Sequence, residues 1–125
     1  MHRIGKSFGF EAAHRLSGLP EGHKCGRSHG HSYSVEVRLA ARRLSGPGFV
    51  ADFAVLDEFR AYLQRTFDHR DLNDVMDAEP TSENLARHFF RWCATGLALP
   101  DGVRVESVRV SETASTWAEY APEEA

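Results

Sequence analysis

The sequence predicts an α+β fold in which two helices pack on one face of an antiparallel four-stranded sheet, in the order β-β-α-α-β-β. Residues 29–41 alternate between apolar and polar side chains, as a strand with one buried face does. Residues 53–67 repeat large apolar side chains at steps of three and four, as an amphipathic helix does. The chain has 125 residues, 42% of them hydrophobic and 26% charged. These values predict one compact domain, residues 1–125, and exclude a disordered or collagen-like chain.

The first two predicted strands each carry histidine at one end. In residues 5–16, the even-numbered face holds Phe8, Phe10 and Ala12, and His14 continues it. Residues 17–28 are rich in glycine, proline and charge, which is typical of a loop. In residues 29–41, His29 and His31 begin the odd-numbered, apolar face. The same face continues through Tyr33, Val35, Val37 and Leu39.

The second half supplies the helices and two further strands. Asp52 is a plausible cap for the helix 53–67, and the acidic segment 68–80 is interpreted as a solvated loop. A second helix is expected after Pro80, capped by Thr81 or Ser82 and ending between residues 96 and 102. Its inward positions are Leu85, Phe89, Trp92 and Cys93. Residues 103–112 and 115–120 are predicted strands, and the two unpaired edges of so small a sheet suggest that copies of the chain associate through them.

Charge and cysteine content narrow the function classes. Fifteen basic and eighteen acidic residues give a net charge of -3, which argues against nucleic acid as a partner. No apolar run approaches the ~18 residues that span a membrane, and the first residues lack the apolar core of a secretory signal. Two cysteines cannot form a disulfide framework, so a reducing cytoplasm is the expected compartment.

The histidines form the most informative pattern. The chain has seven, and His29-Gly30-His31 places two imidazoles on one strand face. His14, at the matching parity of the preceding strand, can supply a third. Three nitrogen ligands with one open position describe a catalytic zinc site. The alternative is a set of hydrogen-bonded core histidines, and the absence of an H-E-x-x-H motif gives no support to a zinc protease.

Four further positions could carry chemistry. Cys25 lies between Lys24 and Arg27, which would favour its thiolate as nucleophile, metal ligand or base, although it could equally be an ordinary loop residue. The adjacent Asp68 and His69 could form a proton-transfer group with Cys25, or could simply cap the preceding helix.

Glu112 ends an apolar strand face. Its carboxylate could reach solvent, or could accept two parallel N–H bonds from a pterin or guanine ring. Cys93, beside Trp92 in an apolar helix, is predicted to fill the core.

Several of these residues lie in strings that resemble the 6-pyruvoyltetrahydropterin synthase family. The chain is most similar to its bacterial branch of 6-carboxy-5,6,7,8-tetrahydropterin synthases, which serve queuosine and other 7-deazapurine pathways. The matching strings, in order, are Phe10-Glu11-Ala12-Ala13-His14-Arg15-Leu16, Glu21-Gly22-His23-Lys24-Cys25-Gly26-Arg27-Ser28-His29-Gly30-His31, Val50-Ala51-Asp52-Phe53, Asp68-His69, Leu72-Asn73, Pro80-Thr81-Ser82-Glu83-Asn84 and Ser111-Glu112-Thr113.

The resemblance implies a fold, an assembly and roles for the residues. The fold is the tunnelling fold, in which three subunits join their sheets into a barrel and two trimers form a homohexamer, with pockets between subunits. His14, His29 and His31 would hold zinc, Cys25 would be the catalytic base, and Asp68 and His69 would complete the proton relay. Glu112 would anchor the pterin, helped by Thr81, Ser82 and Glu83.

The implied reaction converts 7,8-dihydroneopterin triphosphate to 6-carboxy-5,6,7,8-tetrahydropterin, releasing acetaldehyde and triphosphate. We further expect Lys24 and Arg27 to contact the triphosphate. Two alternatives remain open: a 6-pyruvoyltetrahydropterin synthase, which eliminates triphosphate only, and a non-catalytic pterin-binding homologue. Cys25 stands where another branch has glutamate, which makes aldolase-like release of a 6-hydroxymethyl pterin less favourable.

Overall fold

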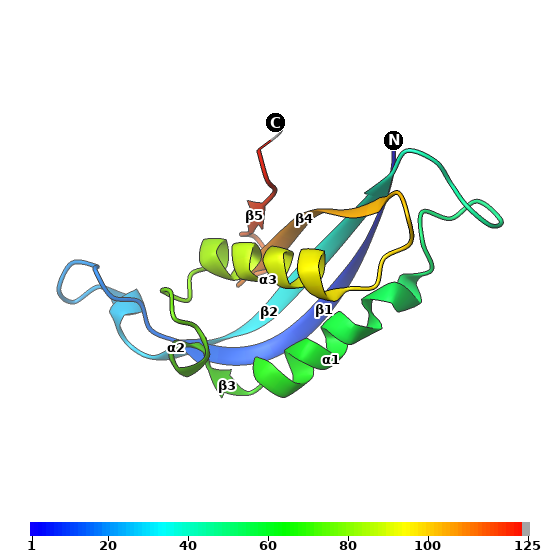
Figure 1. Ribbon diagram of the computed structural model, residues 1–125. Coiled ribbons are helices and arrows are strands. Elements are labelled where there is room, and N and C mark those ends of the chain that lie inside the picture. Colours follow the sequence, from blue (N-terminus) through cyan, green and yellow to red (C-terminus); the bar gives the residue numbers. More distant parts are fainter. Residues whose placement is uncertain (124–125) are drawn as a thin grey trace.

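The computed structural model describes residues 1–123 and is shown in Figure 1. Its helices and strands follow one another as β1 His2–His14, β2 His29–Ala41, α1 Asp57–Thr66, β3 Arg70–Asp71, α2 Leu72–Val75, α3 Ser82–Gly96, β4 Val103–Ser111 and β5 Ala118–Tyr120. Short 3₁₀ helices cover Lys24–Gly26 and Phe53–Leu56. Among these residues, no helix is long and apolar enough to cross a membrane.

The strands form one sheet in the order β3-β1-β2-β4-β5. β1 and β2 are antiparallel over their whole length, from the pair His2 and Ala41 to the pair His14 and His29. β4 is antiparallel to β2 and to β5, whereas β3 runs parallel to β1. The predicted α+β class is confirmed, but the sheet has five strands rather than four and is mixed. The fifth, β3, has two residues, too few to produce a periodic pattern in the sequence.

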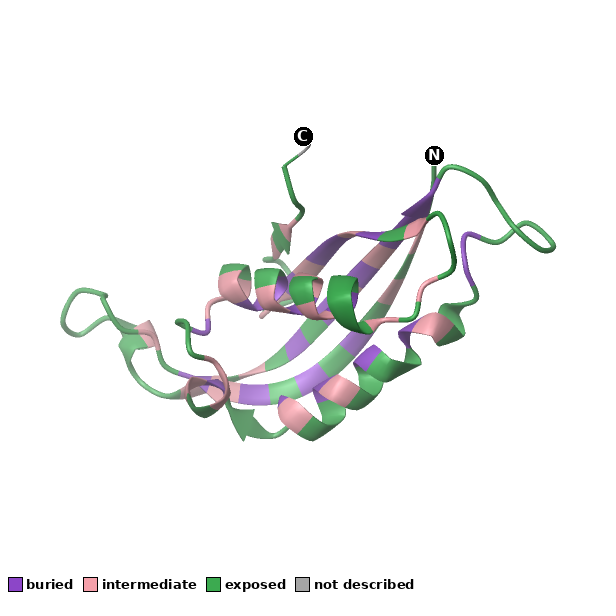
Figure 2. Ribbon diagram, in the orientation of Figure 1, coloured by how far each residue is buried: buried purple, intermediate pink, exposed green. Residues whose placement is uncertain are grey.

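The two long helices lie on the same face of the sheet (Figure 1). Buried and exposed residues alternate along the strands in Figure 2, as the sequence periodicity predicts. Phe89 of α3 is fully buried, and its ring lies 4.9–6.0 Å from those of Phe10, Phe59 and Phe67, centroid to centroid. The core therefore joins β1 (Phe10), α1 (Phe59), Phe67 directly after α1, and α3 (Phe89). Cys93 is also fully buried, and burial raises the pKa of its thiol to about 12, as expected for a core cysteine.

Two segments differ from the sequence prediction. The predicted helix 53–67 divides, because the side chain of Asp52 accepts the Ala54 N–H and starts a separate 3₁₀ turn before α1. The segment 68–80 is not a purely solvated loop. It contains β3 and α2, and Leu72 is fully buried. A single buried leucine among acidic residues gives no periodic pattern, so the sequence does not predict these two elements.

The other face of the sheet is polar and built largely of small residues. Glycine and serine recur there on β1 and β2, at Gly5, Ser7, Gly9, Gly30, Ser32 and Ser34. Three of its arginines are paired with carboxylates: Arg3 with Glu106 at 2.6 Å, Arg38 with Glu36 at 2.7 Å, and Arg109 with Glu119 at 3.4 Å. Among the helices that the structure describes, none covers this face (Figure 1).

The outer edge of β1 is mostly open. Within residues 1–123, β1 pairs with β3 only at Ala12 and Ala13. At Glu11, the backbone N–H donates to the Asp68 carboxylate and the carbonyl accepts the His69 N–H. In the described part of the chain, no strand lies beside β1 on that side before Glu11, so this edge can accept a strand of another chain.

Candidate metal centre

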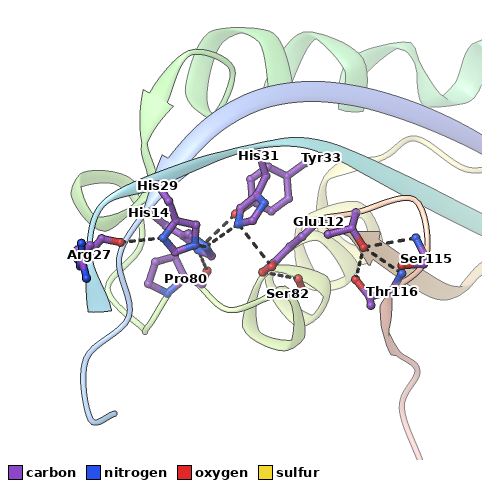
Figure 3. A network of polar contacts seen from close by, with 11 residues as sticks. His14, Arg27, His29, His31, Tyr33, Pro80, Ser82, Glu112, Ser115 and Thr116 are labelled. Atoms are coloured by element: carbon purple, nitrogen blue, oxygen red, sulfur yellow. Dashed lines mark hydrogen bonds and ion pairs between the residues drawn. The ribbon is translucent and has the colours of Figure 1, made fainter. Parts of the chain in front are cut away.

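Three histidines converge at one end of the β1–β2 ladder (Figure 3). His14 is buried, and His29 and His31 are partly exposed. The Nε2 atom of His14 lies 2.9 Å from Nε2 of His29 and 3.2 Å from Nε2 of His31. Three ligand atoms, one from each ring, all lie within 4.8 Å of one another, close enough to hold one metal ion.

Backbone carbonyls fix the orientation of two of these rings. Nδ1 of His14 donates to the carbonyl of Pro80, and Nδ1 of His29 donates to the carbonyl of Arg27, both at 2.7 Å. A carbonyl only accepts, so each Nδ1 carries its proton and each Nε2 of the neutral ring presents a lone pair. Lone pairs that face one another at this distance repel unless a cation lies between them. The ring orientation and outer hydrogen bonds are those of metal-binding histidines, so the residues fit a metal ion.

Glu112 borders the triad. One of its carboxylate oxygens lies 3.5 Å from Nε2 of His31, and the other accepts a hydrogen bond of 2.8 Å from the Ser82 hydroxyl (Figure 3). Burial lowers the pKa of His31, and the Glu112 carboxylate opposes that shift. Burial, followed by the effect of Glu112, raises the pKa of Tyr33, whose hydroxyl lies 3.3 Å from Nδ1 of His14.

A side-chain clamp holds the chain just after His14. The Asn73 side chain accepts the Arg15 N–H at 2.9 Å and donates to the Arg15 carbonyl at 3.0 Å. Asn73 lies in α2, whose start is capped by the Asp71 side chain. The segment 71–80 thus fixes His14 in two ways. Asn73 binds the backbone of the next residue, Arg15, and the Pro80 carbonyl accepts a hydrogen bond from the His14 ring.

Cys25 lies in the 3₁₀ turn Lys24–Gly26 and is partly exposed. The His23 side chain accepts the Cys25 N–H, and the Cys25 carbonyl accepts the Leu16 N–H, which ties the loop back to the end of β1. In the described part of the chain, no hydrogen bond joins the Cys25 thiol to the triad or to Asp68 and His69. Cys25 lies near His29 because the two are close in sequence. The predicted relay of Cys25 with Asp68 and His69 is not connected by hydrogen bonds among residues 1–123.

Asp68 and His69 form a pair at the β1 edge. His69 Nδ1 lies 3.0 Å from the Asp68 carboxylate. The Glu11 backbone N–H, and secondarily His69, lower the pKa of Asp68. His69 is largely exposed and has a positive φ of 58°, a left-handed conformation that is unusual outside glycine.

His69 lines an open depression of about 550 Å³ together with Glu11, Gly30 and Ser32. These three strand residues have the parity opposite to that of the triad, so the imidazole lies toward the polar side of the sheet. His31 and Ala12 also border the depression. No hydrogen bond or ion pair among residues 1–123 connects the Asp68–His69 pair to the triad.

The remaining predicted residues fall into two groups. Thr81 caps α3 by accepting the Asn84 N–H, and Ser82 binds Glu112, so both support this end of the sheet. Glu83, Lys24 and Arg27 are exposed, and in residues 1–123 none of the three forms an ion pair.

Three contributions were not anticipated from the sequence: the carbonyls of Pro80 and Arg27, and the Asn73 clamp. Backbone carbonyls have no side-chain pattern. Asn73 belonged to a matching string, but nothing in the sequence indicated its role.

Comparison with known proteins places the chain among pterin enzymes. The sequence model described as 6-pyruvoyl tetrahydropterin synthase matches residues 3–123. The 6-carboxy-5,6,7,8-tetrahydropterin synthase of Synechocystis sp. is 40% identical over 123 residues, covering 94% of this chain and 91% of that protein. The protein of the same name from Aquifex aeolicus is 32% identical over 158 residues, covering 96% and 98%. Among solved structures, Caenorhabditis elegans 6-pyruvoyl tetrahydropterin synthase matches with a TM-score of 0.83 at 26% identity, covering 98% of this chain and 96% of that one.

Proposed function

The chain belongs to the 6-pyruvoyl tetrahydropterin synthase family, and from this premise we propose that it is a zinc-dependent 6-carboxy-5,6,7,8-tetrahydropterin synthase. It would convert 7,8-dihydroneopterin triphosphate to the 6-carboxy product with release of acetaldehyde and triphosphate, in the cytoplasm and within queuosine or another 7-deazapurine pathway. The observation that carries this proposal is the convergence of three Nε2 atoms, with two rings held by carbonyls, in a chain 40% identical to a protein of that name.

His14, His29 and His31 would hold the zinc ion, since three imidazoles with one open position suit a catalytic site. When bound, zinc would polarise the hydroxyl groups of the substrate side chain and make the adjacent protons more acidic. The protein's own contribution is to fix the tautomer and the orientation of two of these rings. The carbonyls of Pro80 and Arg27 serve that purpose by accepting the Nδ1 protons.

Cys25 would act as the catalytic base, and Asp68 and His69 would carry protons. Among residues 1–123, no hydrogen bond joins Cys25 to the Asp68–His69 pair, so we propose that the working pocket lies between subunits. The open outer edge of β1, beside which the Asp68–His69 pair lies, supports this arrangement. A neighbouring subunit that pairs with this edge would bring the pair close to a second triad. Repetition of that contact would close a barrel of three subunits, and two such trimers would form the expected hexamer.

Glu112 would anchor the pterin ring by accepting two N–H groups from its 2-amino edge. Ser82 already fixes one oxygen of this carboxylate, which orients it beside His31. Thr81 contributes by capping α3, and Glu83 lies in the first turn of that helix. Lys24 and Arg27, exposed on the loop before His29, would contact the triphosphate.

The first experiment is incubation of the zinc-loaded protein with 7,8-dihydroneopterin triphosphate, with products identified by mass and an aldehyde assay. Acetaldehyde in equal amount to a 6-carboxy pterin is the expected result. Triphosphate without acetaldehyde would instead identify a 6-pyruvoyltetrahydropterin synthase, which the structural match to the C. elegans protein favours as second candidate. No turnover with correctly bound metal would contradict both and leave a pterin-binding homologue.

Two variants separate the roles of metal and base. His31→Ala should lose most of the zinc, measured by metal analysis after dialysis. Cys25→Ala should retain zinc and fold but lose turnover. Full zinc content in the first variant, or full turnover in the second, would remove that residue from the proposed machinery.

The phosphate contact is tested with two substrates. Replacing Lys24 and Arg27 by glutamine should raise KM for the triphosphate substrate more than for dihydroneopterin without phosphates. Equal changes for the two compounds would refute the contact.

A further inference from the structure

The end of the sheet opposite the histidine triad carries a second, unassigned pocket. Arg42, Arg43 and Arg104 line a cavity of about 470 Å³ together with Asp101 and Gly102. The pair His2 and Ala41 closes the β1–β2 ladder at this end, and the pair His14 and His29 closes it at the other. Twelve residue steps of β1 separate the ends, a contour of roughly 40 Å at strand rise. A ligand in this pocket therefore cannot contact the metal centre of the same chain.

The arrangement follows from the local chain path. Arg42 and Arg43 come directly after β2, and Arg104 lies on β4 opposite Ala40. The turn before β4 closes with a hydrogen bond from the Val103 N–H to the Pro100 carbonyl, and Gly102 has a φ of 80°. A side chain at this position would be strained, so glycine permits the tight turn that brings β4 beside the end of β2.

The charges in this pocket differ from those elsewhere on the sheet. On the polar face, Arg3, Arg38 and Arg109 each have a carboxylate partner within 2.6–3.4 Å. None of the ion pairs found in residues 1–123 involves the three arginines of the pocket. Three guanidinium groups and one carboxylate, that of Asp101, leave a local charge of about +2 in a chain whose net charge is -3. The local excess is thus not a consequence of a generally basic surface.

We propose that this pocket binds an oligophosphate, the phosphate chain of a nucleotide or inorganic triphosphate. Guanidinium groups pair with phosphate oxygens through two parallel N–H bonds, and a cluster of them suits a ligand with several negative charges. The cavity, about 470 Å³, is larger than a single phosphate group fills. Its size lies within the range of small-molecule sites. The site is independent of the proposed reaction, since it shares no residue with the metal centre.

The test is calorimetric titration of the zinc-loaded assembly with inorganic triphosphate and, separately, with GTP, at fixed ionic strength. The background carries Lys24→Gln and Arg27→Gln, so that phosphate binding proposed for the active site is removed. In this background one oligophosphate per chain should bind. Adding Arg42→Gln and Arg104→Gln should weaken binding about tenfold or more, since each lost pair is a charge-assisted hydrogen bond.

The matched control replaces Arg60 and Arg65, two exposed arginines of α1, by glutamine. It changes the net charge equally and should bind as the background does. Binding of both probes with equal affinity would assign the phosphate chain alone. Tighter binding of GTP would add the nucleoside to what the pocket recognises only where the Arg42 and Arg104 replacements abolish that gain, since the guanine ring could otherwise bind at Glu112. Absence of binding in the background, unchanged affinity in the pocket variant, or equal loss in the α1 control would overturn the proposal. Turnover assays of the same variants report separately on the proposed function.

Discussion

Replacement of Asn73 by alanine tests whether the segment 71–80 holds the metal centre in place. Asn73 makes two hydrogen bonds to the backbone of Arg15, of 2.9 and 3.0 Å, directly after His14, one of the three proposed metal ligands. Alanine removes both bonds without changing the core, because Asn73 is not fully buried. The variant should fold with a looser junction between β1 and the loop 15–28.

The size of the effect follows from the number of bonds. A typical protein hydrogen bond contributes about 0.5–1.5 kcal/mol net, so two give roughly 1–3 kcal/mol. For a chain of this length, a change of 1 kcal/mol shifts the melting temperature by roughly 4 °C. The expected loss is therefore about 4–12 °C. Zinc affinity should fall as well, since the backbone that carries His14 is no longer fixed.

The change in melting temperature is measured by thermal unfolding of wild type and variant at equal protomer concentration, once with zinc and once with a chelator. Competition with a chromophoric chelator measures the zinc affinity. Asn73→Asp is the matched variant: it retains an acceptor for the Arg15 N–H but cannot donate to the Arg15 carbonyl, so its stability should lie below that of wild type. A melting temperature of Asn73→Ala within 1 °C of wild type, in both conditions, would refute the clamp.

Three further predictions concern the core and two titrating groups. Phe89→Ala should lower the free energy of unfolding by about 3–5 kcal/mol in denaturant titration, because the ring is fully buried against three others; a loss under 1 kcal/mol would contradict its packing. Burial lowers the pKa of His88 from 6.5, so the unfolded state binds a proton more readily and stability should fall as the pH decreases below 6.5; in His88→Gln that part of the pH dependence should disappear. The carboxyl of Asp68 should titrate below 3.8 by carbon NMR, and His69→Ala should retain most of the depression because the backbone N–H of Glu11 is its largest cause; return to 3.8 in the variant would reverse that order.

The triad could be predicted from the sequence because strand parity is a strict rule. His14 lies at the end of one alternating strand and His29 and His31 at the start of the next, so any hairpin that buries both apolar faces brings them together. The observed register places His14 opposite His29, as this rule predicts. The same rule predicted which residues of β1 and β2 form the core.

The surroundings of the triad could not be predicted in this way. The Nδ1 protons of His14 and His29 are accepted by the carbonyls of Pro80 and Arg27, groups that every residue possesses and that no sequence pattern distinguishes. The segment after α1 has one buried leucine and no period, so β3 and α2 were not foreseen. The position of the Asp68–His69 pair beside the outer edge of β1 depends on how the segment after α1 meets that strand, which composition does not reveal.

His69 has a consequence for how this chain would respond to selection for heat resistance. A non-glycine residue in the left-handed region costs roughly 1–2 kcal/mol, and His69 occupies that region at φ 58°. Glycine at this position would relax the main chain but delete the imidazole. Under the proton-relay role proposed for His69, thermal stability and turnover would favour different residues at this one position. A library screened only for thermal tolerance should then enrich a change that a screen for catalysis rejects.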